Sequence, residues 1–313
     1  MNPSISVIVP THNTRELTLR CLASIARGSK ESPEVIVVDD GSTDDTVERV
    51  REHFPKSKIV ALAPARGFTG AVNAGMEAAC GELLFLLNSD TELAPDTLAL
   101  IAEAFVLQPR LGVGGGVLRF PDGRPQWSAG TEPTMLWMLM LATGVAGLLE
   151  RLPGYRSLRP LEAAERSRVD WVSGAAMTIR RSAWLEGGAL DERFRFYCQD
   201  LDYCLRLRDV GWQVAIIPHA DVLHHGGATI GRRAGSVRAG FNPELLWSDL
   251  VRFFEKRHGP RRARSVARLL RCGGWLRIKA RLLAEPFLSS EQREQRRLET
   301  GAFIQAVKGL SAW

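Results

Sequence analysis

The sequence predicts an α/β protein with a mostly parallel sheet flanked by helices. Three apolar runs carry this prediction, at residues 5–9, 35–38 and 83–87. A strand that is apolar on both faces is typical of a parallel sheet covered by helices on both sides. Segments with helical spacing separate the runs, so the first 105 residues alternate strand and helix, as right-handed crossover connections require.

The elements of this region are expected as four strand–helix pairs. Each strand is an apolar run, and each helix has either a start signal or apolar residues at helical spacing. Pro95 suits the first helical position of the fourth helix. We expect strands at 5–10, 35–38, 59–62 and 83–87, and helices after Asn13 or Thr14, through Val47 and Val50, at 69–79 and after Pro95.

Length and composition set the broad class. The 313 residues can hold one large α/β domain plus a tail, or two small domains. Apolar content of 45% and charged content of 24% are ordinary for a soluble globular protein. The five cysteines form no CxxC pair and read as reduced thiols, and the first nine residues lack the basic start of a signal peptide. We therefore expect a cytoplasmic protein.

The apolar run at 83–87 ends abruptly on Asn88-Ser89-Asp90. Open α/β sheets bind their ligands at the carboxyl ends of the strands. A carboxylate there can hold a divalent cation, and the cation can hold a diphosphate. The alternative is that Asp90 caps the next helix, but Ala94-Pro95-Asp96 gives that helix its own start signal. We favour a metal site at Asp90.

The second strand also ends on acids, Asp39 and Asp40, beside a Gly41-Ser42 turn. An acid in this position can accept a hydrogen bond from a base-ring NH or a ribose hydroxyl. The sequence has neither GxGxxG nor GxxxxGK[ST], so it supports neither a dinucleotide fold nor a P-loop. The alternative is a turn followed by a helix N-cap.

Four segments in this order resemble family 2 inverting glycosyltransferases, within them the bacterial rhamnosyltransferase-like branch. They are SVIVPTHN at 6–13, VVDDGSTD at 37–44, RGFTGAVNAG at 66–75 and LNSDT at 87–91. The resemblance covers roughly residues 4 to 230. It implies the Rossmann-like GT-A fold, a nucleoside-diphosphate sugar as donor, and Mg²⁺ or Mn²⁺ as cofactor.

The resemblance also implies a nucleotide site. In it, Asp40 would bind the base, Asp39 would support it, and Arg66 could pair with a phosphate or simply be solvated. The residues of this site would be Pro10, Thr11, Asn13, Asp39, Asp40, Arg66 and Asn88.

The resemblance places two metal ligands. Asp90 would be the metal carboxylate of the DxD position, whose first acid is replaced here by Asn88. His224 matches the metal-binding histidine, and His225 would point the other way. Imidazole is a suitable ligand for Mn²⁺. The alternative is a histidine pair in a glycine-rich loop with no metal.

The middle of the chain should form the acceptor half. We expect a strand at 111–118, a hairpin through Pro121-Asp122-Gly123 to residues 125–127, and strands at 169–180 and 212–218. The apolar segment 135–149 is shorter than the roughly 20 residues that span a bilayer, so we expect a buried or interfacial helix. Trp171 and Gly174 would lie on the acceptor side.

Residues 197–206 match the family's Glu-Asp-x-Asp segment, with Gln199 in place of the glutamate. Asp200 occupies the position of the general base. Asp202 lies two residues further on and cannot share the same helix face, so we expect it to support the site. The alternative is that an aspartate at a helix start merely complements the helix dipole.

The expected division is a GT-A domain at 1–240, with a nucleotide-binding half at 1–110 and an acceptor half at 111–240, and a basic helical extension at 241–313. Between residues 252 and 281 the only acid is Glu255, while lysines, arginines, leucines and Trp275 alternate. Such a helix suits an anionic membrane surface. The alternative is a helical pair packed on the core with a solvated basic face. No nucleic-acid motif accompanies the charge, so we expect no nucleic-acid partner.

The predicted function is inverting transfer of a sugar to a glycan or lipid-linked acceptor in cell-surface polysaccharide synthesis. The resemblance favours dTDP-L-rhamnose as donor. One alternative is a nucleotidyltransferase, although Thr11-His12-Asn13 offers little basic charge for a triphosphate. Another is a sugar-nucleotide-binding protein that has lost catalysis, as the departures at Asn88 and Gln199 suggest.

Overall fold

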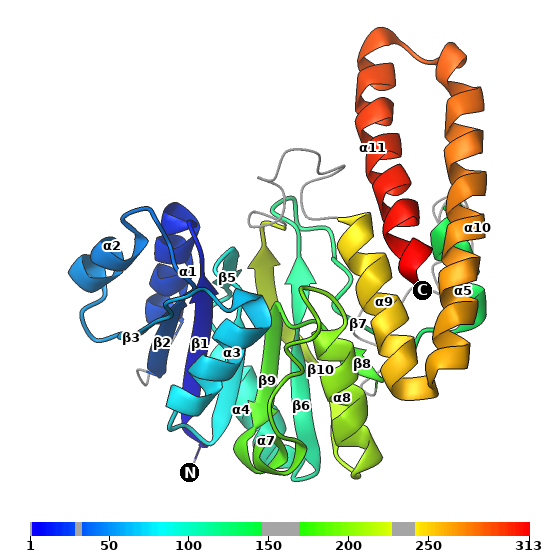
Figure 1. Ribbon diagram of the computed structural model, residues 1–313. Helices are drawn as coiled ribbons and strands as arrows, with labels where there is room; N and C mark the ends of the chain where they lie inside the picture. The colour runs from blue at the N-terminus through cyan, green and yellow to red at the C-terminus, as the bar shows by residue number, and fades with distance from the viewer. Residues whose placement is uncertain (1, 29–32, 146–168, 227–241) are drawn as a thin grey trace. The chain divides into compact units, whose positions relative to one another are not determined.

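The computed structural model describes residues 2–28, 33–145, 169–226 and 242–313, which form two compact units (Figure 1). Unit 1 is built from residues 1–132, 160–193 and 199–226, and unit 2 from the rest of the chain. Besides the C-terminal residues, unit 2 contains the helix that follows Pro133 and the short segment Phe194–Cys198.

Unit 1 contains an eight-stranded sheet, a two-stranded sheet and the helices that cover them. The elements are β1 (Ile5–Thr11), α1 (Arg15–Arg27), β2 (Glu34–Asp39), α2 (Thr46–His53), β3 (Lys58–Ala61), α3 (Gly67–Ala78), β4 (Leu83–Leu87), β5 (Thr91–Leu93), α4 (Thr97–Leu107), β6 (Leu111–Arg119), β7 (Ala129–Gly130), β8 (Trp171–Val172), β9 (Ala176–Arg180), α7 (Arg181–Gly187), α8 (Gln199–Asp209) and β10 (Gln213–His224).

The large sheet has the order β3-β2-β1-β4-β9-β6-β10-β5. β1 pairs in parallel with β2 and β4, β2 with β3, and β6 with β10. β9 is antiparallel to both β4 and β6, and β5 is antiparallel to β10. The mostly parallel α/β sheet predicted from the sequence is therefore confirmed, with two strands that run the other way.

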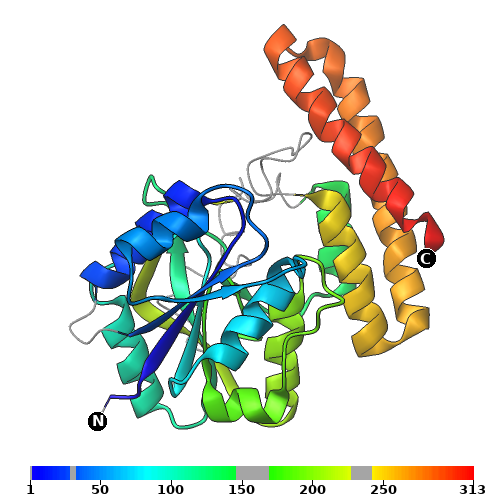
Figure 2. The same cartoon turned by 60° about the vertical axis from the view of Figure 1, so that its left-hand side comes forward.

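Helices bury both faces of this sheet, as Figures 1 and 2 show for α1 and α3. On one face, α3, α7 and α8 contribute apolar side chains to one core cluster. On the other face, α1, α2 and α4 pack against the alternate residues of the same strands. All five residues of β4 are buried, which explains the uninterrupted apolar run at 83–87.

The fold differs from the expectation in three places. The predicted strand at 169–180 is divided into β8 and β9 by Ser173–Ala175. Residues 91–93 form the short strand β5, which no prediction anticipated. The strand predicted at 212–218 continues through Pro218 as β10, with a register shift against β6, and His224 is its last residue. The turn at 121–123 is confirmed, with Gly123 at φ 81° and Phe120 N donating to Arg124 O.

The described elements of unit 2 are helical. They are α5 (Met135–Thr143), α9 (Pro243–His258), α10 (Pro260–Ala284), η2 (Glu285–Phe287), α11 (Ser290–Gly309) and η3 (Leu310–Ala312). α10 and α11 run antiparallel and side by side (Figures 1 and 2). Trp247 and Phe303 are buried between the helices. Gly274 permits this packing, because a Cβ there would lie 2.9 Å from the Trp247 ring.

The apolar segment predicted at 135–149 begins as α5, and its end lies outside the described residues. Met138 and Ala142 of α5 are buried, while Leu136 is 65% exposed. Among the helices that the structure describes, none combines the length and the apolar character required to cross a bilayer.

Candidate active site

The loops after β1 and β2 are tied together through Asn13. Its Oδ1 accepts hydrogen bonds from the backbone N–H groups of Thr43 (2.8 Å) and Asp44 (3.2 Å), and its own N–H donates to Ser42 Oγ (2.9 Å). Asn13 has φ 53°, a left-handed conformation in which asparagine is enriched. Asn13 therefore shapes the loops at the carboxyl ends of two adjacent strands.

Asp39 and Asp40 are almost fully buried at the end of β2. Asp40 accepts hydrogen bonds from Arg66 N (2.6 Å) and Gly67 N (2.9 Å), so it caps the start of α3. Asp39 accepts from Ser42 N at 3.2 Å. Each oxygen of an ionised carboxylate has two lone pairs, so both acids retain capacity for a ligand donor. Their predicted contacts with the base stay predictions.

Pro10 and Thr11 end β1, and Thr11 faces the protein interior. Its Oγ1 bonds to Thr14 Oγ1 (3.0 Å) and Thr18 Oγ1 (2.8 Å) in α1. Thr14 Oγ1 in turn bonds to Ser89 Oγ at 3.1 Å. This hydroxyl chain joins the end of β1 to residues 88–90. The polar side chain of Thr11 is thus used inside the protein, and only its backbone remains for the predicted nucleotide contact.

Arg66 forms an ion pair with Glu192, with 2.6 Å between Nη2 and Oε1. Both side chains are about two-fifths exposed, and exposed pairs contribute about 0–1 kcal/mol. Glu192 also accepts from Asn73 Nδ2 at 3.0 Å. A phosphate at Arg66 would therefore compete with Glu192. The sequence offered no signal for this partner, which lies more than one hundred residues away.

Asp90 and His224 face each other. His224 Nε2 lies 3.4 Å from Asp90 Oδ1, and both side chains are largely buried. The alternative role of Asp90 as a helix cap is excluded, because α4 begins at Thr97 with Asp96 as its N-cap. His225 Nε2 instead bonds to Glu92 Oε1 at 3.0 Å, so His225 points elsewhere, as expected.

A carboxylate oxygen and an imidazole nitrogen form a donor set that fits Mn²⁺ or Mg²⁺. Over the described ranges, no three His, Cys, Asp or Glu side chains converge as a complete protein cage. Such cages are not required, since Mg²⁺ is commonly bound by one or two carboxylates plus water and substrate phosphates. Asp90 and His224 therefore suit a cation that is shared with a diphosphate.

A second group of predicted site residues, separate from Asp90 and His224, includes Asp200. It lies in the first turn of α8, where its Oδ2 accepts from Gly174 N (2.9 Å) and its Oδ1 from Leu201 N (2.8 Å). Burial raises the pKa of the Asp200 carboxyl above its usual range, although the two N–H donors oppose this shift. A raised pKa makes the ionised carboxylate a stronger base near neutral pH.

Two buried oxygens beside this group have no hydrogen-bond partner within the described part of the chain. They are Asn88 Oδ1 and Gln199 Oε1. Both residues adjoin Ser173–Ala175: Asn88 N donates to Ala175 O (3.0 Å), and Gln199 Nε2 lies near Gly174. Buried acceptors are normally paired, so each of these two oxygens is a candidate acceptor for a water or ligand donor.

Asp202 forms an ion pair with Arg206, four residues further along α8. Its Oδ2 accepts from Arg206 Nε at 3.0 Å, and Arg206 also donates to Ala189 O at 2.8 Å. This ion pair ties α8 to the loop after α7, which is a supporting structural role.

Trp171 packs edge-on against Trp127, with ring centroids 5.3 Å apart, and its Nε1 donates to Thr131 O. Trp127 is 50% exposed, so the pair presents an aromatic surface. Trp127 was not predicted as a site residue. The sequence indicated only that it follows Gln126 in the predicted hairpin.

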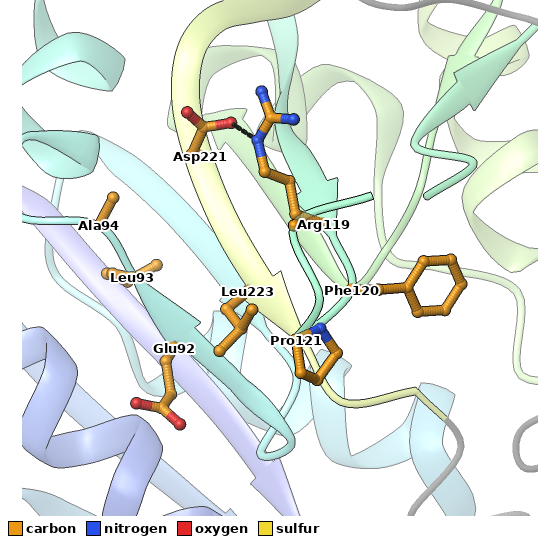
Figure 3. A pocket seen from close by; sticks show the side chains of 9 residues that line it. Glu92, Leu93, Ala94, Arg119, Phe120, Pro121, Asp221 and Leu223 are labelled. Carbon is orange, nitrogen blue, oxygen red and sulfur yellow. Dashed lines mark hydrogen bonds and ion pairs between the residues drawn. The ribbon is translucent and has the colours of Figure 1, made fainter. Parts of the chain in front are cut away.

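A separate pocket of about 300 Å³ lies at the edge formed by β5, β6 and β10 (Figure 3). Its lining includes Glu92, Leu223 and an ion pair between Arg119 and Asp221 at 2.6 Å. Side chains alternate along a strand, so Asp221 and Leu223 lie on the face of β10 opposite His224. The pocket includes none of the predicted site residues.

Comparison with known proteins identifies the family. The model of "Glycosyl transferase family 2" matches residues 6–180. An N-acetylglucosaminyl-diphospho-decaprenol L-rhamnosyltransferase of Mycobacterium tuberculosis is 30% identical over 251 residues, covering 75% of this chain and 80% of the relative. The O-antigen biosynthesis protein RfbC of Myxococcus xanthus is 31% identical over 75% of this chain, which spans only 18% of that larger protein.

Solved structures share the fold. A mannosyltransferase of Pyrobaculum calidifontis, in complex with GDP-Man and Mn²⁺, aligns with a TM-score of 0.61 at 18% identity, over 100% of this chain and 88% of that one. GalNAc-T7 with UDP, GalNAc and Mn²⁺ aligns with a TM-score of 0.58 at 15% identity, over 98% of this chain and 56% of that one. The GT-A fold expected from the sequence is confirmed.

Proposed function

The chain belongs to glycosyl transferase family 2, and from that premise we propose that it is a metal-dependent inverting sugar transferase. The proposed donor is a nucleoside-diphosphate sugar, with dTDP-L-rhamnose favoured, and the proposed acceptor is a lipid-linked glycan precursor in cell-surface polysaccharide synthesis. The M. tuberculosis relative, named as an L-rhamnosyltransferase acting on a decaprenol-linked sugar, supports both choices.

One observation carries the proposal. The segment Asn88–Asp90 links the candidate metal ligands to the candidate base. Asp90 faces His224. Asn88 N donates to Ala175 O, next to the Gly174 N–H that donates to Asp200. Candidate leaving-group ligands and a candidate base are thereby attached to the same strand end. This linkage supports a single displacement in which the base and the leaving-group ligands act on one donor.

In the proposed reaction, Asp200 accepts the proton of the acceptor hydroxyl. The acceptor oxygen forms a bond to the anomeric carbon while the bond from that carbon to the diphosphate breaks on the opposite face. The configuration is therefore inverted. A general base typically contributes about 10²–10⁴-fold to the rate.

Asp90 and His224 would hold the divalent cation. When bound, the cation would stabilise the charge that develops on the diphosphate. Asn88 Oδ1 and Gln199 Oε1 would accept hydrogen bonds from donor or acceptor hydroxyl groups, which satisfies two oxygens that have no described partner.

We also propose peripheral association with an anionic membrane, where a lipid-linked acceptor would be found. The supporting feature is the exposed face of α10. It carries Arg264, Arg268 and Lys279 in line with Trp275, while the opposite side is buried in unit 2. Not all basic residues of the tail contribute, because Arg281 pairs with Glu299 at 2.7 Å and Arg277 stacks on Phe303.

The test of function is a donor panel with the purified chain. dTDP-L-rhamnose, UDP-N-acetylglucosamine and GDP-mannose are each incubated with a polyprenyl-diphosphate-linked acceptor, with EDTA and then with added Mn²⁺ or Mg²⁺. We expect transfer from one donor that EDTA abolishes and the cation restores. Full transfer in EDTA would exclude metal dependence. Formation of a nucleoside-diphosphate sugar from a nucleoside triphosphate and a sugar phosphate would support the nucleotidyltransferase alternative. Donor binding without turnover would support a catalytically inactive sugar-nucleotide-binding protein.

A further inference from the structure

Gln126 is the residue in contact with His224 on the side away from Asp90. It follows the turn after β6, and its backbone N–H donates to Leu118 O at 2.8 Å. Its side-chain Nε2 donates to the backbone oxygens of His224 (2.6 Å) and Arg119 (3.3 Å). Both of those partners can only accept, so the orientation of the Gln126 amide is determined.

This orientation decides which nitrogen of His224 carries the proton. With Nε2 of Gln126 bound to two carbonyl groups, its Oε1 faces His224 Nδ1 at 2.8 Å. An amide oxygen can only accept, so the Nδ1 of His224 must be the donor. In the neutral imidazole, Nε2 therefore bears the lone pair, and this lone pair lies on the side of Asp90 Oδ1.

The distance between His224 Nε2 and Asp90 Oδ1, 3.4 Å, exceeds that of an ordinary N–H···O hydrogen bond. A divalent cation bound between an ionised Asp90 and a neutral His224 would be coordinated by both acceptors. Histidines that bind metals usually donate their other N–H to an oxygen acceptor, which fixes the tautomer and the ring orientation. Gln126 Oε1 is an acceptor of this kind.

We propose that Gln126 is a positioning residue that holds the His224 imidazole as the Nδ1–H tautomer, so that Nε2 is available to the divalent cation. This inference rests on the proposed metal-dependent function. Its effect on the chemistry is indirect, because Gln126 acts through His224. Loss of such an outer partner typically lowers metal affinity about 10–100-fold.

A merely structural role is the rival explanation, since the Gln126 amide also ties the turn to β10. Two substitutions separate the roles. Gln126→Leu removes the acceptor for Nδ1–H and both bonds to the carbonyl oxygens. Gln126→Glu also removes the two bonds to the carbonyl oxygens but keeps an acceptor for Nδ1–H. Gln108→Leu, at an exposed glutamine after α4, is the matched control.

The first measurement is the tautomer of His224 in the metal-free full chain, from the ¹⁵N shifts of labelled histidine side chains. The chain has six histidines, so the His224 signals are assigned by their loss in His224→Asn. We expect the Nδ1–H form in the wild type, in Gln126→Glu and in Gln108→Leu. In Gln126→Leu we expect a shift toward Nε2–H, which can donate to Asp90.

The second measurement is Mn²⁺ affinity, from titration of the full chain with Mn²⁺ alone. We expect Gln126→Leu to bind about 10–100-fold more weakly, with Gln126→Glu close to the wild type. If Gln126→Leu does not fold, Gln126→Met replaces it. An Nε2–H tautomer in the wild type, or equal losses of Mn²⁺ affinity in the Leu and Glu variants, would overturn the proposal. A wild type with the Nδ1–H tautomer that binds no Mn²⁺ would instead contradict the proposed metal dependence.

Discussion

Position 199, directly before the candidate base, carries an amide where the family resemblance implies a carboxylate. Gln199 is buried next to Asp200. Burial raises the pKa of the Asp200 carboxyl. The base proposed above must be ionised to accept a proton, so activity should fall as pH decreases through this raised pKa. The acid limb of the pH profile should therefore lie above the ordinary aspartate value of about 3.9.

Gln199→Glu should move this acid limb to higher pH. A second negative charge beside Asp200 disfavours ionisation of the Asp200 carboxyl and raises its pKa further. The measurement is kcat/KM against pH for the wild type and the variant. Gln108→Glu is the control, since it adds the same charge at an exposed glutamine at the end of α4. An acid limb that stays in place, or moves to lower pH, would show that Asp200 is not the titrating base.

At the residue scale, the sequence identified the polar groups at the strand ends because their types and positions are local features. Asp90 follows the buried strand β4 and His224 ends β10, where a carboxylate or imidazole is unusual, whereas Asp200 in the first turn of α8 was predicted from the family resemblance. Their partners were not predictable in the same way. Gln126 and Glu192 acquire their roles only when distant segments meet, and no local pattern distinguishes them from solvated residues.

Within unit 2, α9 is linked to the segment that precedes α8 in the chain. Asp249 is fully buried and accepts hydrogen bonds from Phe196 N (3.1 Å), Tyr197 N (3.0 Å) and Arg252 Nη1 (2.9 Å). A weaker contact at 3.4 Å comes from Arg195 N. Each buried donor without a partner costs about 1–3 kcal/mol, so this carboxylate is central to the stability of the unit.

Asp249→Leu should lower the free energy of unfolding by roughly 3 kcal/mol or more, because several donors would lose their acceptor together. Urea denaturation monitored by tryptophan fluorescence reports the change, since Trp247 lies two residues away in the same helix. Asp96→Leu removes an exposed aspartate that forms no side-chain cap in α4, and it should cost far less. Equal costs for the two variants would contradict the role given to Asp249.

At the element scale, the alternation of strands and helices in the first 105 residues was predictable, because the apolar period changes clearly between them. The direction of β9 relative to its neighbours was not predictable from the sequence. A strand buried on both faces has the same pattern whether its neighbours are parallel or antiparallel, and β9 lies between β4 and β6 through long-range pairing. The short strand β5 was hidden because three residues carry too little periodicity.

The whole chain has a formal charge of +6, and its C-terminal helices hold a large part of the basic residues. On α10 the exposed basic residues lie on the same side as Trp275 (43% exposed) and Leu283 (76%), and Phe287 in η2 is 89% exposed. Cations near an anionic bilayer contribute on the order of 1 kcal/mol each, and the apolar side chains can enter the interface.

The full chain should float with vesicles containing anionic lipid and be released at high salt. Arg264→Glu combined with Arg268→Glu should strongly weaken flotation, since two of the three cations in line with Trp275 are reversed. Trp275→Ser should weaken it. Arg49→Glu with Arg51→Glu, on the exposed side of α2, is the charge-matched control and should float normally. If the wild type stays unbound at low salt, or the control loses as much binding, the basic face of α10 is only solvated.

We propose that Asp200 is the general base of an inverting transfer. Its most direct test is Asp200→Asn, with donor affinity measured by calorimetry and transfer measured by product formation under single-turnover conditions. The substitution keeps the size of the side chain and one of its two oxygen acceptors, and the proposed nucleotide and metal ligands are other residues, so donor affinity should be unchanged. The rate of transfer should fall by at least about 10²-fold, as loss of a general base predicts. Transfer at a near-normal rate by the asparagine variant would contradict the account.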